Sequence, residues 1–199
     1  MGRARAPESV YEELDRAAKS PISGKDFSFD SEALERHMES DDPTSLVLKA
    51  HLYVEHILIR HVEMSIGKAN DIEIDRMNFP LKVALARRFM MNEICIDACI
   101  YLNVLRNKAA HRVDFDIGER EVDALVESMG EHFRNAILEM SEDLSAKGSG
   151  KGKKYLYILK ACLKTLIIVL EIGRIQRERH EKVLLRRLRE FNEERSNQR

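Results

Sequence analysis

The sequence predicts an all-α protein, a helical bundle with a C-terminal helical arm, from three observations. Almost every long segment repeats its apolar residues with a helical period, and no segment shows the convincing alternation of a strand. The 199 residues include only nine glycines and four prolines, too few for the many turns of a β-sandwich or barrel. Hydrophobic residues make up 44% and charged residues 34%, a balance typical of a soluble globular chain.

The first predicted helices are short and polar. Residues 9–19 have a helical pattern, and the segment 21–30, PISGKDFSFD, is expected to be a loop. Asp30 or Ser31 caps a second helix that ends near residue 39. Asp42 is the N-cap of a long helix that has Pro43 in its first position and continues to about residue 66.

Four further helices are expected after the break at 67–75. They cover residues 78–91, 92–111, 119–144 and 155–195, and the glycine- and lysine-rich segment 145–154 is a flexible linker. The chain therefore divides into short N-terminal helices at 1–41, a helical bundle at 42–146, and a basic linker with a C-terminal helical arm at 147–199.

The net charge of −1 conceals a strong asymmetry. Residues 1–146 hold 18 basic and 28 acidic side chains, a balance of −10, whereas residues 147–199 hold 15 and 6, a balance of +9. Such a difference suggests an arm for a polyanion, or two parts that attract each other.

The remaining composition indicates a cytoplasmic protein. The N-terminus has no apolar signal segment, and the cysteines lie in apolar helical patterns, as expected of buried thiols in a reducing compartment. The apolar run near residue 165 is interrupted by Lys160, Lys164 and Glu171, so a membrane span is not expected. The three cysteines are Cys95, Cys99 and Cys162.

The candidate site is a trio at the end of the helix at 92–111. Arg106, Asn107 and His111 share one flank, at the edge of an apolar stripe. The small side chain of Ala110 leaves an open notch between them. The alternative is structural, with His111 capping its helix and pairing with an aspartate at 114 or 116, and with Arg106 bound to a carboxylate in the bundle.

This stretch resembles the Arg-(four to six residues)-His signature of the HEPN superfamily, helical domains found in many prokaryotic ribonucleases and toxins. Arg106, Asn107 and His111 match its sub-pattern with asparagine directly after arginine. The resemblance covers roughly residues 43–145, with a long helix before the motif helix, a shorter one between them, and a long helix after it. It implies a HEPN-like bundle and a homodimer that brings two notches together.

The residue types suit metal-independent RNA cleavage. A histidine can move protons near neutral pH, an arginine can hold a phosphate through two hydrogen bonds, and an asparagine can orient either group. We therefore expect Arg106, Asn107 and His111 to be catalytic, with no metal and no cofactor. The neighbouring Lys108 and Arg112 are expected to bind RNA.

Glu55 is a further candidate residue of the site. It lies in an apolar stripe, where a charge is costly unless it is paired. One interpretation is that it orients Arg106. The alternatives are that it pairs with Arg60, Arg87 or Arg88, or that this part of the helix faces water. His51 and Glu55 share a face, but the other histidines do not join them, so a metal site is not expected. The stripe comprises Leu48, Leu52, Glu55, Ile59, Val62 and Ile66.

The arm at 174–189 has seven basic and two acidic residues. It is either a solvated helix face with a small docking stripe or an RNA-binding arm, in which Arg186 and Arg187 would contact phosphates. Its apolar seam comprises Leu184, Leu188 and Phe191.

Two features of the sequence favour a homodimer. One is the long apolar helix of the arm, and the other is a second apolar face on the helix at 42–66. This face comprises Ala50, Tyr53, Val54 and Ile57.

Two functional hypotheses follow. The first is a metal-independent endoribonuclease that acts in a toxin, stress or phage-defence setting. Its expected partners are RNA and a second copy of the chain, and a protein antitoxin or regulator is a further candidate. The second is a non-catalytic, HEPN-like regulatory module that binds RNA or a protein. A notch of this kind can bind phosphate without cleaving it, so the sequence alone leaves both open.

Overall fold

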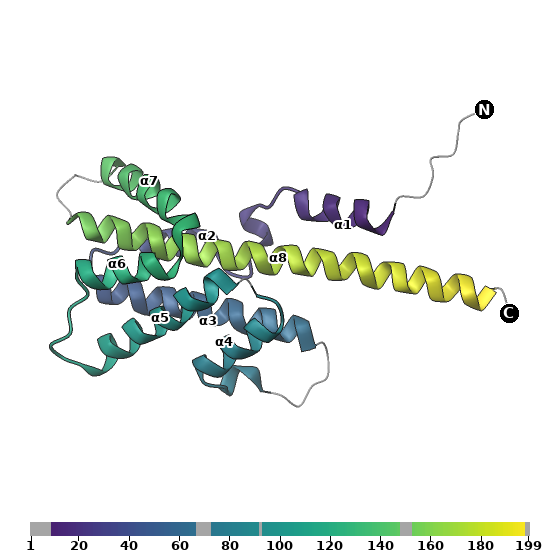
Figure 1. Ribbon diagram of the computed structural model, residues 1–199, viewed down its shortest axis with the longest axis horizontal. Coiled ribbons are helices and arrows are strands. Elements are labelled where there is room, and N and C mark those ends of the chain that lie inside the picture. Colours follow the sequence, from purple (N-terminus) through teal and green to yellow (C-terminus); the bar gives the residue numbers. More distant parts are fainter. Residues whose placement is uncertain (1–8, 67–72, 92, 148–152, 198–199) are drawn as a thin grey trace.

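The computed structural model describes residues 9–66, 73–91, 93–147 and 153–197. These residues form eight α-helices and two short 3₁₀ turns, and none of them belongs to a strand, so the predicted all-α class is confirmed (Figure 1). The helices are α1 (Val10–Lys19), α2 (Ser31–Met38), α3 (Pro43–Ile66), α4 (Phe79–Arg88), α5 (Glu93–His111), α6 (Glu119–Ser128), α7 (Glu131–Lys147) and α8 (Lys154–Asn197).

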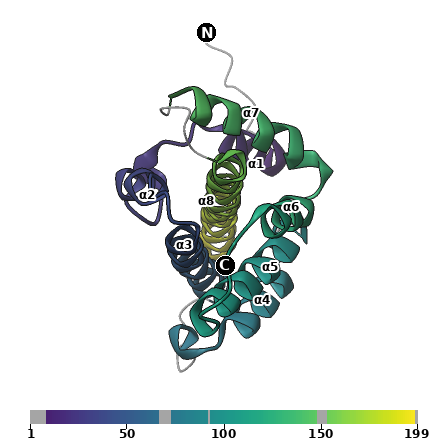
Figure 2. The same ribbon diagram turned by 90° about the vertical axis from the view of Figure 1, so that its left-hand side faces the viewer.

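The centre of the fold is α8. Seen end-on, α8 lies in the middle, with the other helices arranged around it (Figure 2). It packs against α3, α7 and α1, and its first half is largely buried. The predicted boundary at residue 147 therefore does not separate an appended arm from the bundle, because only the second half of α8 projects from the core (Figure 1). The buried apolar residues of this half include Leu159, Leu163, Leu166, Ile167 and Leu170.

Most helices begin where the sequence places a capping side chain. Ser9 forms a capping box with Glu12 at the start of α1, and the Asp30 carboxylate accepts hydrogen bonds from two backbone amides at the start of α2. Asp42 accepts from two amides at the start of α3, which has the expected Pro43 in its first turn. The Asn78 side chain accepts from the Leu81 amide at the start of α4.

The prediction of one continuous helix at 119–144 is wrong, because this segment forms two helices, α6 and α7. The break falls at Gly130, whose φ of 76° lies in the left-handed region that glycine adopts without strain. The Gly130 amide donates to the Glu127 carbonyl as α6 ends, and α7 begins at the next residue. Residues 148–152 of the predicted linker lie outside the described residues, whereas residues 145–147 belong to α7 and residue 154 begins α8.

The three cysteines are buried thiols, as predicted. Burial raises the pKa of the Cys95 thiol to about 11 and that of Cys162 to about 12, so neither is a reactive thiolate near neutral pH. Within the described parts of the chain, we find no helix whose length and apolar character would let it cross a membrane.

Candidate functional site at the end of α5

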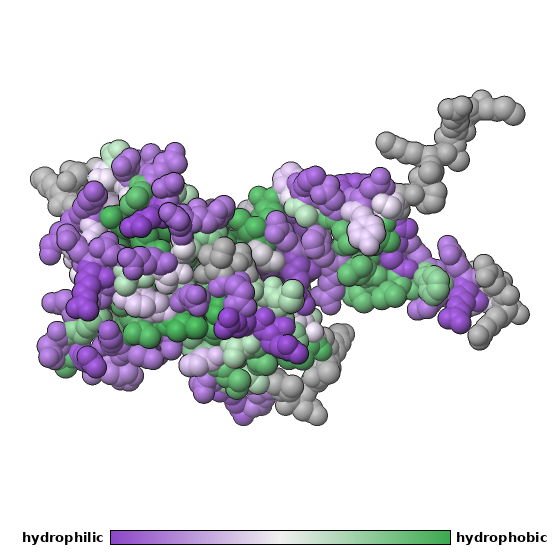
Figure 3. Space-filling view, in the orientation of Figure 1, coloured by the Kyte–Doolittle hydropathy of each residue, from purple (hydrophilic) through white to green (hydrophobic). Residues whose placement is uncertain are grey.

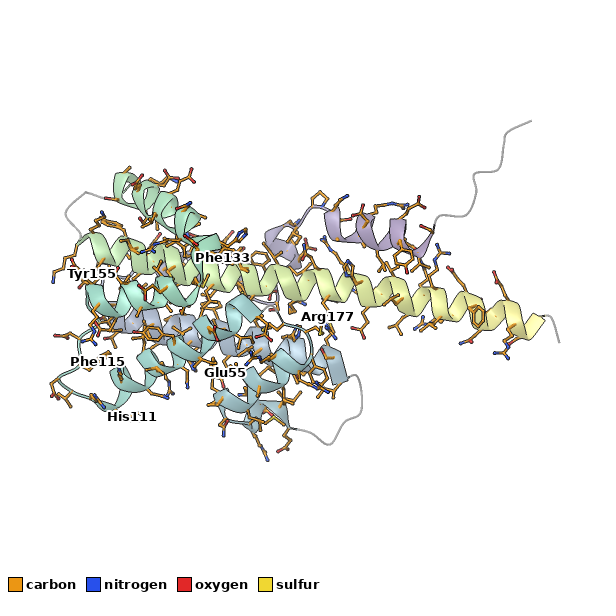
Figure 4. The ribbon with its side chains drawn as sticks, viewed as in Figure 1. Glu55, His111, Phe115, Phe133, Tyr155 and Arg177 are labelled. Carbon is orange, nitrogen blue, oxygen red and sulfur yellow. The ribbon has the colours of Figure 1, made fainter. Side chains whose placement is uncertain are left out.

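The predicted trio lies on the last two turns of α5. Leu102 and Leu105 anchor this part of the helix in the core, so the opposite flank is turned outward. His111 is exposed at the end of the helix (Figure 4), Asn107 is also exposed, and Arg106 is half-buried. Nη1 of Arg106 donates to Oδ1 of Asn107 at 3.0 Å, so the asparagine holds one side of the guanidinium in place.

The structural alternative for the trio is not observed. Among the described residues, no carboxylate lies within ion-pair distance of Arg106 or His111, and this includes Asp114 and Asp116 in the turn that follows α5. A half-buried arginine and an exposed histidine therefore share one helix end, with no acidic partner among the described residues. Such a surface is suited to an anionic ligand.

Glu55 does not pair with Arg106, and this part of the predicted site is corrected. Its Oε1 lies 2.5 Å from Nζ of Lys82 on α4, and the Lys82 side chain is almost fully buried. Lys82 also donates to the Asp75 carbonyl at 3.0 Å. The carboxylate meets this ammonium because Lys82 points into the bundle between α3 and α4, whereas Arg106 points to the surface.

His51 nevertheless links Glu55 to α5. The Nδ1 atom of His51 lies 4.0 Å from the Glu55 carboxylate, and Nε2 donates to Oδ1 of Asn103 at 3.2 Å. Asn103 stands one turn before Arg106 and Asn107. Burial lowers the pKa of His51, and the nearby positive charges of Arg106 and Lys82 lower it further, although the Asn103 hydrogen bond and Glu55 oppose them. A partly buried polar chain thus contacts α5 one turn before the trio.

Sequence reasoning missed Lys82 as the partner of Glu55. The signal was present, because Lys82 falls on the apolar face of its helix. The residues that share this face are Phe79, Val83 and Ala86, all buried. A lysine inside such a stripe needs a carboxylate, and Glu55 is the one that α3 supplies.

The two basic residues beside the trio differ in their surroundings. The ammonium of Lys108 lies over the ring of Phe115, 5.5 Å from its centroid, and this cation–π contact holds it near the end of α5. Arg112 is exposed just beyond the helix. Both therefore add positive charge near His111, and Figure 4 shows Phe115 and His111 at this end of α5.

Arg186 and Arg187 do not join this surface. They lie on the projecting half of α8, where both form ion pairs with Glu13 of α1, and Arg187 is 2.8 Å from that carboxylate. Glu190 lies within 4 Å of each guanidinium as well. Their charge is largely neutralised within the chain, so the expectation of an RNA-binding arm loses its main support. Figure 3 shows hydrophobic side chains on this projecting part, and the exposed ones are Leu184, Leu185, Leu188 and Phe191.

The second apolar face predicted on α3 is part of the core. Ala50, Val54 and Ile57 are completely buried, so this face cannot meet a second copy of the chain. Exposed apolar side chains occur instead on α5, at Ile100 and Val104. Helical spacing places these two in line with Asn107 and His111.

Comparisons with protein-family models, curated proteins and solved structures found no match to this chain. The functional argument therefore rests on the residues and the geometry of the site.

Proposed function

We propose that the protein is a metal-independent endoribonuclease of the HEPN type, with its active site at the end of α5. One observation carries the proposal. Arg106, Asn107 and His111 lie together on an accessible helix end, and no described carboxylate neutralises the arginine or the histidine. These are the residues that matched the HEPN signature in the sequence.

Each residue has a role in transesterification. The 2′-hydroxyl of one nucleotide attacks the adjacent phosphorus and loses its proton, the bond from phosphorus to the 5′-oxygen breaks, and that oxygen takes up a proton. The products are a 2′,3′-cyclic phosphate and a 5′-hydroxyl. His111 transfers a proton, Arg106 stabilises the additional negative charge on the phosphate, and Asn107 keeps the guanidinium oriented.

A homodimer completes this mechanism. The reaction needs both a proton acceptor and a proton donor, and one chain brings a single histidine to this end of α5. Two copies that meet through their α5 helices would supply two. The exposed Ile100 and Val104, in line with His111, support an interface of this kind. Light scattering at micromolar concentration should give twice the monomer mass, and a monomer would contradict the shared site.

If the chain is a monomer, the site has only one histidine to transfer protons, and this favours a second candidate function. The end of α5 would then bind RNA phosphates, or an acidic partner protein, without cleaving RNA. A gel-shift measurement that shows RNA binding, together with intact RNA in the same sample, would identify this non-catalytic module.

The biological setting that we propose is a cytoplasmic toxin, stress or phage-defence system, in which a protein antitoxin or regulator restrains the nuclease. Induced expression should then arrest growth, and expression of His111→Ala should not. Equal growth arrest by both forms would separate any toxicity from this site.

The direct test is cleavage of single-stranded RNA by the purified protein in EDTA. We expect products with 2′,3′-cyclic phosphate and 5′-hydroxyl ends. Arg106→Ala should abolish their formation while leaving the helix content unchanged by circular dichroism, because its side chain bonds only to the surface residue Asn107. A requirement for magnesium, or products with 3′-hydroxyl ends, would contradict the mechanism.

A further inference from the structure

A cavity of about 350 Å³ lies at the other end of α5, against the middle of α8. Its walls come from α3, from the turn after α4, from the first turn of α5 and from one face of α8. This size is at the lower end of the range of small-molecule sites in proteins. The residues on which its chemistry depends are His61, Met90, Cys95, Gly173, Arg177 and His180.

Two imidazoles line the cavity with a nitrogen left unsatisfied. His61 is only 2% exposed, and its Nε2 donates to the Phe89 carbonyl at 3.1 Å. Its Nδ1 is buried and has no partner in the described chain, and the same is true of Nε2 of His180. A buried polar atom without a hydrogen bond destabilises a protein by about 1–3 kcal/mol. Both residues line the same cavity, so one ligand there can bond to both atoms.

His61 presents an acceptor to the cavity. Burial lowers its pKa, and the positive charges of Arg177 and Arg174 lower it further, although the bond to the Phe89 carbonyl opposes them. The imidazole is therefore neutral near pH 7. Since Nε2 carries the hydrogen that Phe89 accepts, Nδ1 carries a lone pair. A ligand must offer this atom a hydroxyl or an amino hydrogen.

Arg177 supplies a fixed positive charge. Its Nη1 donates to the Phe89 carbonyl at 2.6 Å, and no carboxylate of the described residues forms an ion pair with it. Arg174, one turn earlier, contrasts with it, because Glu171 and Glu178 each lie 2.8 Å from its guanidinium. Figure 4 shows Arg177 beside α8, well away from His111.

The backbone next to the cavity has two costly features. Gly173 lies within α8, where glycine is less favourable than alanine by about 1 kcal/mol, and a Cβ there would meet nothing within 4 Å. Met90 has a φ of 64°, the left-handed conformation that usually belongs to glycine at the end of a helix. The first keeps the space above α8 open, and the second turns the Phe89 carbonyl towards His61 and Arg177.

We propose that this cavity binds a small organic oxyanion that carries a hydroxyl or amino group beside its anionic group. Arg177 and His180, one turn apart on α8, donate to the oxyanion, and Nδ1 of His61 accepts from the neighbouring hydroxyl or amino group. Apolar side chains of Met91, Val169 and Leu170 hold the remainder of the ligand. A metal cation does not suit the cavity, because Arg177 is beside it and the described residues contain no group of three metal-ligating side chains.

The inference is independent of RNA cleavage, because the cavity and His111 lie at opposite ends of α5. Its test is isothermal titration calorimetry on the full chain with three probes: inorganic phosphate, glycerol 3-phosphate and lactate. We expect glycerol 3-phosphate to bind about two- to tenfold more tightly than inorganic phosphate, because its alcohol hydroxyl can donate to His61 while its phosphate group accepts from Arg177 and His180. Tighter binding of lactate would identify a carboxylate as the preferred oxyanion.

Two variants locate the binding in the cavity. Gly173→Leu fills the open space, and Arg177→Gln removes the charge but keeps a donor for the Phe89 carbonyl. Each should weaken the tightest probe about ten- to a hundredfold. Arg189→Gln, on an exposed turn of the same helix, should bind it as the wild type does.

Circular dichroism and the melting temperature verify that each variant is folded, and Gly173→Leu is expected to be at least as stable as the wild type. If none of the three probes binds to the wild type at millimolar concentration, the proposal is wrong. It is equally wrong if Gly173→Leu and Arg177→Gln are folded and bind as tightly as the wild type.

Discussion

An arginine and a histidine lie near each end of α5, in opposite surroundings. At the C-terminal end, Arg106 and His111 lie at the surface, open to a large partner such as RNA. At the N-terminal end, Arg177 and His61 converge on a cavity, together with Cys95, that only a small molecule can enter. At about 1.5 Å of rise per residue, Cys95 and His111 lie roughly 24 Å apart along the helix. Exposure, more than residue type, determines which ligand each end can bind.

The largest expected effect concerns the polar chain beneath the C-terminal end. Glu55→Ala should lower the free energy of unfolding by about 3–5 kcal/mol, because it leaves the buried Lys82 ammonium without a counter-charge. Urea denaturation measures this loss. The matched control is Glu63→Ala, which breaks the exposed pair with Arg60 and should lower the stability by less than about 1 kcal/mol.

The double variant Glu55→Leu, Lys82→Met sharpens the same prediction. It leaves no charge unpaired, so its loss should be smaller than the sum of the losses of its two component substitutions, Glu55→Leu and Lys82→Met, measured singly. Additive losses would show that the two side chains do not interact, and the supporting role of this chain for α5 would then be abandoned.

A smaller effect should appear when the pH is lowered, because one buried histidine lies near each end of α5. Burial lowers the pKa values of both His51 and His61 in the folded chain, whereas a histidine in the unfolded chain has its ordinary pKa of about 6.5. As the pH falls below this value, the unfolded chain therefore binds more protons than the folded chain. The contribution of these two histidines to the free energy of unfolding is therefore fully present above this pH and is lost as the pH falls below it. Each histidine contributes a slope of up to about 1.4 kcal/mol per pH unit.

Urea denaturation between pH 7.5 and 5 measures this slope. His51→Gln retains a donor for Asn103 and removes one of the two groups, so its slope should be shallower than that of the wild type. An unchanged slope would mean that His51 takes up its proton equally easily in the folded and the unfolded chain.

The smallest effect concerns the cavity at the N-terminal end. Gly173→Ala should raise the free energy of unfolding by about 0.5–1 kcal/mol, because the added methyl group meets open space and alanine favours the helix. The same substitution at Gly130, where φ is 76°, should instead lower it. If Gly173→Ala is destabilising, the cavity is not open above α8.

Local signals allowed much of the fold to be predicted, and long-range contacts account for the rest. Capping residues such as Asp42 and Asn78 act within one turn, so the sequence places most helix starts correctly. The break at Gly130 was missed because the apolar period continues through it. α8 is central because several other helices pack around it. The apolar period of a helix predicts which of its faces is buried, but it does not predict which other helices cover that face.

The same distinction holds for the two candidate sites. The trio from Arg106 to His111 lies within two helical turns, so its proximity follows from the sequence alone. The partner of Glu55 comes from another helix, and the spacing of residues within α3 does not single out Lys82 among the cations of the chain. The cavity draws on four separate elements, and neither His61 nor Arg177 is unusual until α3 and α8 are packed together.

The central claim is that the C-terminal end of α5 cleaves RNA through His111. The most direct measurement compares the rate of single-stranded RNA cleavage in EDTA for wild type, His111→Ala and His132→Ala, where His132 is an exposed histidine on α7. We predict that His111→Ala loses about a hundredfold or more, the usual contribution of a proton-transferring side chain, and that His132→Ala retains the wild-type rate. Cleavage by His111→Ala at the wild-type rate, or equal losses in both variants, would contradict the claim.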